Sequence, residues 1–270
     1  MKTAIATASA VLVAISGIAT AETPPAAPDV GITILAPEGV MPGSTFELGV
    51  EFDIEAEWHI YWKNPGDAGL PTEIEIAGPE GVTTGDVRWP IPSRFASADG
   101  TVGYGYAHRA TLWRPVTVPD NFRPGDTLTL DVNVDWLACK LRCIPGSATR
   151  TVTIPIVAST EESFGPEVTG YPDAESAAPF DVRATTGVAG RRTLALSWKN
   201  TAPEVEWFPA PPNPYWIEDI YTNSTERETT ITYKLRSSGR PSPVREMETI
   251  VVITEADGNR RGFTVMVPIT

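Results

Sequence analysis

The chain has two cysteines, Cys139 and Cys143, in the segment WLACKLRCIPG that runs from Trp136 to Gly146. Such a pair can form a structural disulfide, bind a metal ion, or alternate between dithiol and disulfide. Residues four apart in one extended strand are separated by about 13 Å, whereas a disulfide needs Cα atoms within about 4.4–6.8 Å. The two cysteines can therefore bond only across a turn or bulge, which we expect at the end of the preceding strand.

Several features of this segment favour a redox-active pair. A disulfide closing so short a loop stabilises a protein by only about 2 kcal/mol. Lys140 and Arg142 flank the cysteines in an otherwise acidic chain, and nearby cations favour the reactive thiolate. Strand alternation places Cys139 on the polar face, where a partner could reach it. Cys143, beside Arg142 and next to Ile144-Pro145-Gly146, where we expect regular pairing to end, is the expected attacking cysteine, and Cys139 the resolving one.

Two alternatives remain open from the residues alone. The disulfide could be an inert local staple, or the two sulfurs could bind Cu(I). A zinc site needs about four ligands, and the two histidines, His59 and His108, lack ligand spacing to the cysteines. We therefore expect no cofactor, with copper as the one metal still considered.

The surrounding sequence alternates with a period of two, which is typical of strands with one buried face. The run from Phe46 to Trp62 is apolar at even positions and is long enough that we expect a break inside it. The pattern returns in 74–76, 128–136 and 152–156, and the runs are separated by turn signals rich in Pro, Gly, Asn and Asp. No segment shows a helical period, so the sequence predicts an all-β protein with an immunoglobulin-like sandwich.

The alternation of apolar and polar residues stops in 158–180, a segment rich in Ser, Glu, Pro and Ala, and resumes after it. We therefore expect a signal peptide in 1–21, a redox β-sandwich domain in 22–157, a linker in 158–180, and a second, smaller β-sandwich domain in 181–270. Glu255 to Asn259 contains Asp-Gly and predicts a hairpin turn in the second domain.

The N-terminus predicts export. A charged Lys2, an apolar run from Ala8 to Ile18 and the small residues Ala19-Thr20-Ala21 match a secretory signal cleaved after Ala21. We expect a periplasmic protein with no transmembrane segment after signal removal. Removing one Lys changes the formal charge from −13 to −14, which argues against nucleic acid as a partner.

Four segments in order resemble the N-terminal periplasmic domain of DsbD and ScsB type thiol:disulfide interchange proteins. They are WLACKLRCIPG, WHIYWKNPGDAGLPTEIE (58–75), RWPIPSRF (88–95) and GYGY (103–106), and the resemblance covers about 40–157. It implies an immunoglobulin-like sandwich whose Cys139–Cys143 pair relays electrons to thioredoxin-like periplasmic proteins. It also implies a separate membrane protein as electron donor, because this sequence shows no transmembrane segment and no terminal Cys-x-x-Cys domain. The rival hypothesis is a copper-handling or adhesive binding module with an inert disulfide.

Aromatic residues near the pair are further candidates. Trp58 and Trp62 share the even parity and are expected in the core. Tyr104 and Tyr106 lie between glycines on an expected loop and could cap the sulfurs. His59 is expected to be a solvated strand residue, and His108, beside this loop, could touch the site.

Overall fold

The computed structural model describes residues 27–97, 99–159, 164–165, 170–239 and 243–269, and these residues form an all-β structure with two short 3-10 helices. The expected signal peptide lies outside the described residues, as does part of the expected linker. The first ten strands are β1 (Val30–Leu35), β2 (Thr45–Ile54), β3 (His59–Gly66), β4 (Glu73–Ala77), β5 (Thr83–Thr84), β6 (Ser93–Ala96), β7 (Val102–Ala107), β8 (Arg109–Thr117), β9 (Thr127–Cys139) and β10 (Cys143–Pro155).

These ten strands form a sandwich of two sheets. One sheet has the order β1-β2-β8-β5; the other has the order β10-β9-β3-β7-β6, with β4 also paired to β9. The even-numbered residues of β2 point inward, as the alternation predicts, and Leu48, Val50 and Phe52 are fully buried. The expected break lies between β2 and β3, where Glu57 has a φ of 68°. Beyond it the even parity continues, so Trp58 and Trp62 are buried, as predicted.

The remaining elements form a second sandwich. They are β11 (Asp173–Ala174), η1 (Glu175–Ala177), β12 (Phe180–Thr186), η2 (Val188–Gly190), β13 (Arg191–Trp198), β14 (Glu204–Ala210), β15 (Tyr215–Ser224), β16 (Glu228–Ser237), β17 (Glu246–Thr254) and β18 (Arg260–Pro268). Its sheets have the orders β11-β18-β17-β14 and β12-β13-β16-β15. The predicted hairpin turn joins β17 to β18, with Gly258 at a φ of 86°. Both β11 and η1 fall inside 158–180.

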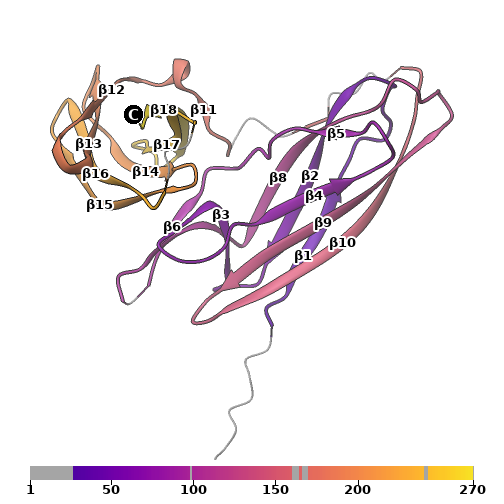
Figure 1. Cartoon of the computed structure of the whole chain (residues 1–270), viewed down its shortest axis with the longest axis horizontal. Coiled ribbons are helices and arrows are strands. Elements are labelled where there is room, and N and C mark those ends of the chain that lie inside the picture. Colours follow the sequence, from indigo (N-terminus) through magenta and orange to yellow (C-terminus); the bar gives the residue numbers. More distant parts are fainter. Residues whose placement is uncertain (1–26, 98, 160–163, 166–169, 240–242, 270) are drawn as a thin grey trace, which may run out of the picture.

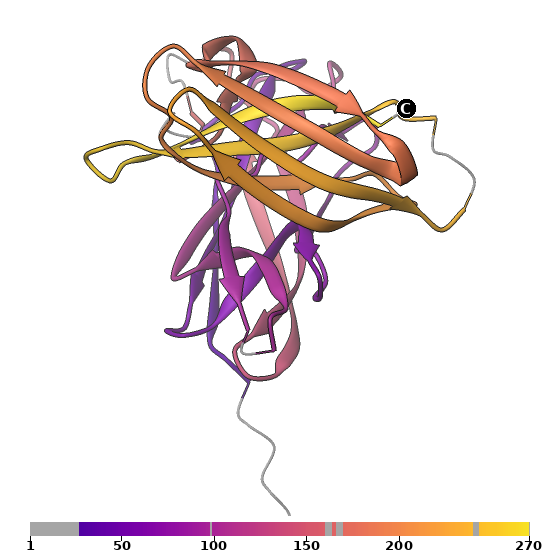
Figure 2. The same cartoon turned by 90° about the vertical axis from the view of Figure 1, so that its left-hand side faces the viewer.

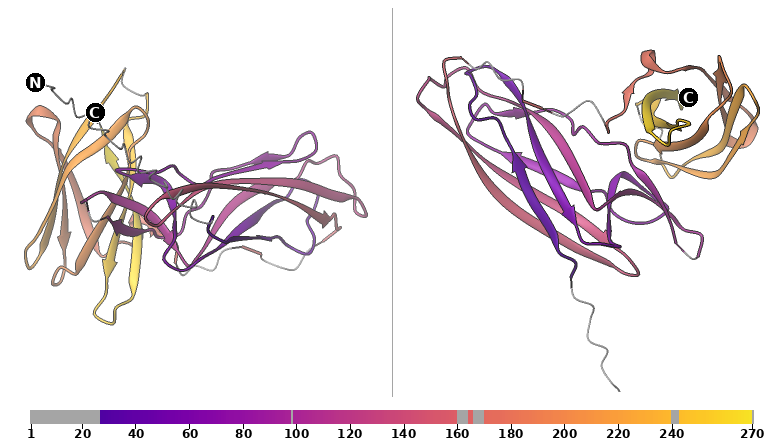
Figure 3. Two further views of the ribbon diagram at one scale, coloured as in Figure 1. Left: turned by 90° about the horizontal axis from the view of Figure 1, so that it is seen from below. Right: turned by 180° about the vertical axis from the view of Figure 1, so that it is seen from behind.

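The second sandwich lies across one end of the first, and its strands cross those of the first (Figures 1, 2 and 3). Phe208 on β14 and Ile250 and Val252 on β17 belong to the same buried cluster as the core of the first sandwich. The ring of Phe208 lies 6.4 Å from that of Trp62 and 5.3 Å from that of Tyr104, both in edge-to-face contact. One face of the second sandwich thus completes the first core.

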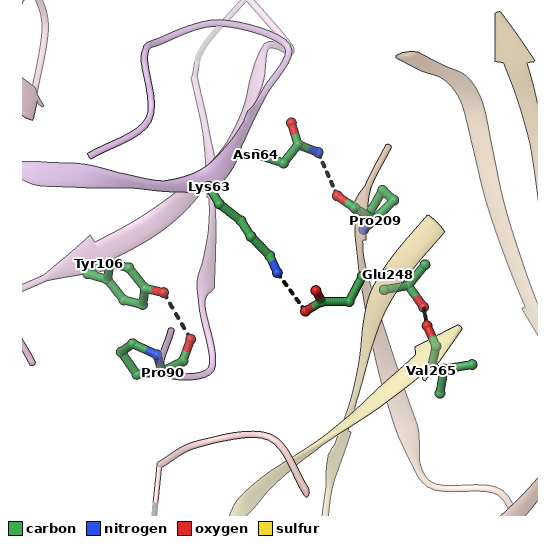
Figure 4. A network of polar contacts seen from close by, with 8 residues as sticks. Lys63, Asn64, Pro90, Tyr106, Pro209, Glu248 and Val265 are labelled. Atoms are coloured by element: carbon green, nitrogen blue, oxygen red, sulfur yellow. Dashed lines mark hydrogen bonds and ion pairs between the residues drawn. The ribbon is translucent and has the colours of Figure 1, made fainter. Parts of the chain in front are cut away.

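Polar contacts border this shared core (Figure 4). Lys63 Nζ lies 2.5 Å from Glu248 Oε1, and Asn64 Nδ2 donates to the carbonyl oxygen of Pro209 at 2.6 Å. Lys63 and Asn64 belong to β3, the strand that also borders the cysteine hairpin. These contacts therefore tie β3 to the second sandwich.

Candidate functional site

A β-hairpin holds the two cysteines. β9 and β10 pair along their full lengths, with Cys139 directly opposite Cys143 and a three-residue turn, Lys140 to Arg142, between them. A disulfide joins the two residues, whose Cα atoms are 4.1 Å apart. The expected turn is therefore present.

The expectation that regular pairing ends at Ile144-Pro145-Gly146 is wrong. Pairing continues through this segment, with Pro145 opposite Leu137. Proline is tolerated there because β10 is the edge strand of its sheet and needs no outward hydrogen bond. Pro145 is exposed and does not line the cavity described below.

The two sulfurs have different environments. Cys143 is exposed, whereas Cys139 is only 3% exposed. The prediction that Cys139 faces solvent is wrong, because β3 lies beside β9 at this point and His59 is directly opposite Cys139. The polar face of β9 is thus covered near its end, and Cys143 is the cysteine that a partner can reach.

Tyr61 is the aromatic residue that contacts the disulfide. Its hydroxyl lies 3.8 Å from Cys143 Sγ, and the residue is 5% exposed. Burial raises the pKa of this hydroxyl, so it stays protonated and can donate to sulfur. Gly69, at a φ of 112°, lies against the ring, since a Cβ there would come within 2.5 Å of it. Sequence reasoning missed Tyr61 because its odd position reads as the polar face.

The prediction that Tyr104 and Tyr106 cap the sulfurs is wrong. Both residues belong to β7, not to a loop, and are buried in the core of the first sandwich. Tyr104 packs against Phe208, and the Tyr106 hydroxyl donates to the carbonyl oxygen of Pro90 at 2.9 Å (Figure 4). His108 is exposed in the turn after β7 and lies outside the cavity lining.

Lys140 and Arg142, the two cationic residues of the turn, differ in their ion pairing. Lys140 Nζ lies 2.5 Å from Glu57 Oε2, and this hydrogen bond and the charge of Lys140 lower the pKa of Glu57. The charge of Lys140 is therefore directed at a carboxylate. Arg142 is exposed and makes no ion pair among the described residues. Leu141, at the tip of the turn, is 95% exposed.

A cavity of about 880 Å³ opens beside the disulfide. The side chain of His59 is not solvated as expected, because it stacks on Phe95 at 4.4 Å and meets the edge of Tyr61 at 5.2 Å. Burial lowers the pKa of His59. The lining comes from β3, β6, β7, the β9–β10 hairpin and neighbouring loops, and consists of Glu57, His59, Tyr61, Ala68, Arg94, Phe95, Ala96, Ser97, Asp99, Thr101, Gly103, Cys139, Lys140, Leu141 and Cys143.

Among the described residues, no group of three or more His, Cys, Asp or Glu side chains could hold a metal ion. No helix within the described ranges has the length and apolar character needed to span a bilayer.

Comparisons with known proteins agree with this geometry. Residues 33–155 match the family described as thiol:disulfide interchange protein DsbD, N-terminal. The solved N-terminal periplasmic domain of ScsB from Proteus mirabilis aligns with a TM-score of 0.65 and 16% identity, over 88% of this chain and 92% of that one. At this identity the alignment supports the fold alone. No curated protein sequence matches the chain.

Two further structural alignments are too weak to support a conclusion. AvmM, which catalyses macrocyclization in alchivemycin A biosynthesis, aligns with a TM-score of 0.24 and 11% identity, over 50% of this chain and 92% of that one. BcpA, the major pilin subunit of Bacillus cereus, aligns with a TM-score of 0.30 and 9% identity, over 90% of this chain and 67% of that one.

The matched residues include nine of the ten strands of the first sandwich in full, half of β1, and the whole cysteine hairpin. The first sandwich of this chain is a DsbD/ScsB-type N-terminal domain of the thiol:disulfide interchange family.

Proposed function

We propose that this chain is a periplasmic thiol–disulfide relay that passes two electrons from a separate membrane donor to thioredoxin-like partners through Cys139 and Cys143. The observation that carries the proposal is the asymmetry of the disulfide. Cys143 is exposed and Cys139 is buried, and both line the same open cavity. A relay needs one cysteine that reaches a partner and a second that stays close to resolve the complex.

The assignment of roles follows from exposure. In the dithiol form, the Cys143 thiolate attacks a partner disulfide, and the first partner sulfur leaves as a thiolate. Cys139 then attacks Cys143 Sγ, the mixed disulfide breaks, and the second partner sulfur leaves as a thiolate. The partner gains two electrons, and the chain becomes the disulfide seen in the structure. A donor dithiol restores the reduced form by the reverse sequence.

Location and domain organisation are part of the same proposal. An exported protein fits the sequence of 1–21, and the ScsB relative is described as periplasmic. We propose 22–157 as the redox domain and 181–270 as a second sandwich domain joined by 158–180. Two separate buried clusters support this division, although Phe208, Ile250 and Val252 belong to the first of them.

Trapping of a mixed disulfide tests the relay. Cys139→Ser should accumulate a covalent complex with a thioredoxin-like periplasmic protein, because the resolving thiol is missing. Cys143→Ser is the matched control and should trap nothing. The complex is detected on non-reducing gels and identified by mass spectrometry. Trapping by Cys143→Ser alone would reverse the roles, and trapping by neither variant would contradict the relay.

The reduction potential separates the relay from an inert staple. A relay should have a potential between about −120 and −270 mV, whereas structural disulfides usually lie below about −300 mV. Equilibration with glutathione or dithiothreitol buffers gives this value. A potential in the structural range, together with Cu(I) binding by the reduced protein, would instead support copper handling.

A further inference from the structure

Four residues form one row across the sheet at the site. Ala107 on β7 is opposite His59 on β3, His59 is opposite Cys139 on β9, and Cys139 is opposite Cys143 on β10. Directly opposite residues of antiparallel strands point to the same face, with Cβ atoms about 4.5–5.5 Å apart. Cys139 therefore has the attacking cysteine on one side and an imidazole on the other.

Aromatic contacts hold the imidazole of His59 in place. Phe95 stacks on its face and Tyr61 meets it edge-on, which restricts the ring. Among the interactions of the described residues, neither ring nitrogen of His59 takes part in a hydrogen bond or an ion pair. A fixed base with free nitrogens beside a buried thiol can accept a proton from it.

Among the described residues, no charged side chain around this cavity forms an ion pair with the imidazole. Glu57 and Lys140 pair with each other, and Arg94 and Asp99 are exposed residues of the cavity lining. Tyr61 is the remaining titratable side chain against the ring besides the cysteines, and it stays protonated. Desolvation lowers the pKa of His59, so near neutral pH the ring is free to accept a proton.

We propose that His59 is the general base that deprotonates Cys139 in the resolving step. This inference rests on the relay proposed above and assigns its proton transfer. The Cys139 thiol gives its proton to the imidazole, and its sulfur attacks Cys143 Sγ in the mixed disulfide. The bond from Cys143 to the partner breaks, the partner sulfur leaves with the electron pair, and the imidazolium releases its proton to that thiolate or to water. In the reverse direction, imidazolium protonates the departing Cys139 thiolate.

Reaction of the reduced full chain with one equivalent of DTNB, an aromatic disulfide with a coloured thiolate product, separates the two steps. Release of the first product thiolate reports attack by Cys143, and its rate depends on DTNB concentration. Release of the second reports resolution by Cys139, and its rate is independent of DTNB concentration. His59→Phe keeps an aromatic ring against Phe95 but removes the base. At neutral pH we expect it to slow the second phase by about 100-fold, at the lower end of general-base effects.

The pH profile distinguishes a base from a packing residue. In the wild type the second phase should level off above the imidazole pKa, which lies below about 6.5. In His59→Phe it should keep rising about tenfold per pH unit toward the ordinary thiol pKa of about 8.5. His59→Gln should behave like His59→Phe. His108 is the other of the two histidines and lies in an exposed turn, so His108→Asn should behave like the wild type.

The proposal is overturned if the second phase of His59→Phe keeps the rate and pH profile of the wild type. It is also overturned if both His59 variants lose the first phase as well, because the residue is then needed for the structure of the site. Either result leaves the relay intact, provided that Cys139→Ser still traps a partner. Failure of that trapping, with normal DTNB phases, would contradict the relay and leave the role of His59 standing.

Discussion

The contact between Tyr61 and Cys143 predicts how strongly the protein stabilises the attacking thiolate. Tyr61→Phe removes only the hydroxyl, which lies 3.8 Å from Cys143 Sγ. A hydrogen bond of this kind contributes about 1 kcal/mol, since the distance is long but the acceptor is charged in the thiolate form. One pKa unit corresponds to about 1.36 kcal/mol. We therefore expect the variant to raise the pKa of the Cys143 thiol by about 0.7 units.

The measurement uses a Cys139→Ser background, in which Cys143 is the only thiol. The rate of alkylation by iodoacetamide is followed against pH, and the midpoint gives the thiol pKa. Tyr104→Phe is the matched control, because it removes a hydroxyl from a buried tyrosine of the core that does not line the cysteine cavity. An unchanged midpoint in Tyr61→Phe, or an equal shift in both variants, would refute the assignment of Tyr61 to the site.

Three further predictions concern stability, and one concerns processing. Replacing both Cys139 and Cys143 by Ser should lower the free energy of unfolding by no more than about 2 kcal/mol in urea titrations, because the closed loop is short; a failure to fold would favour a structural staple. Phe208→Ala should cost about 3–5 kcal/mol, since the ring is 1% exposed and fills the core of the first sandwich; a loss below about 1 kcal/mol would contradict the shared core. Because burial lowers the pKa of His59, the unfolded state binds more protons, so stability should fall as pH drops below about 6.5, and His59→Phe should remove this part of the dependence. Mass analysis of the native protein should show an N-terminus at Glu22, after Ala21; a chain beginning at Met1 would contradict cleavage.

The sandwich was predictable because it depends on a simple alternation. One face of β2 is buried against the opposite sheet, so the even parity from Phe46 onward shows directly which side chains point inward. The break before β3 was also predictable, since the apolar run was too long for one strand. The turn between the cysteines followed from the geometry that a disulfide requires, but the continued pairing of β10 beyond it did not.

The site was less predictable because parity does not show what covers a face. His59, Tyr61 and Cys139 occupy odd positions and read as polar, yet β3 and β9 come together there and bury all three at least in part. The one available signal was their shared parity, which places His59 and Tyr61 on one face of β3. Tyr104 and Tyr106 were misassigned because their neighbouring glycines suggested a loop. Gly105 instead allows close strand contact, as a Cβ there would lie 1.9 Å from the carbonyl oxygen of Ile60.

The core that the two sandwiches share limits how the chain can be shortened. A version ending at residue 157 would lose Phe208, Ile250 and Val252 and would expose the rings of Trp62 and Tyr104 to water. Buried aromatic side chains each cover about 150–250 Å², so the cut would create an adhesive apolar patch and promote self-association. The patch would lie on β3, which carries His59 and Tyr61, and on β7, which pairs with β3. Truncation would therefore disturb the redox chemistry together with solubility, although no cysteine is removed.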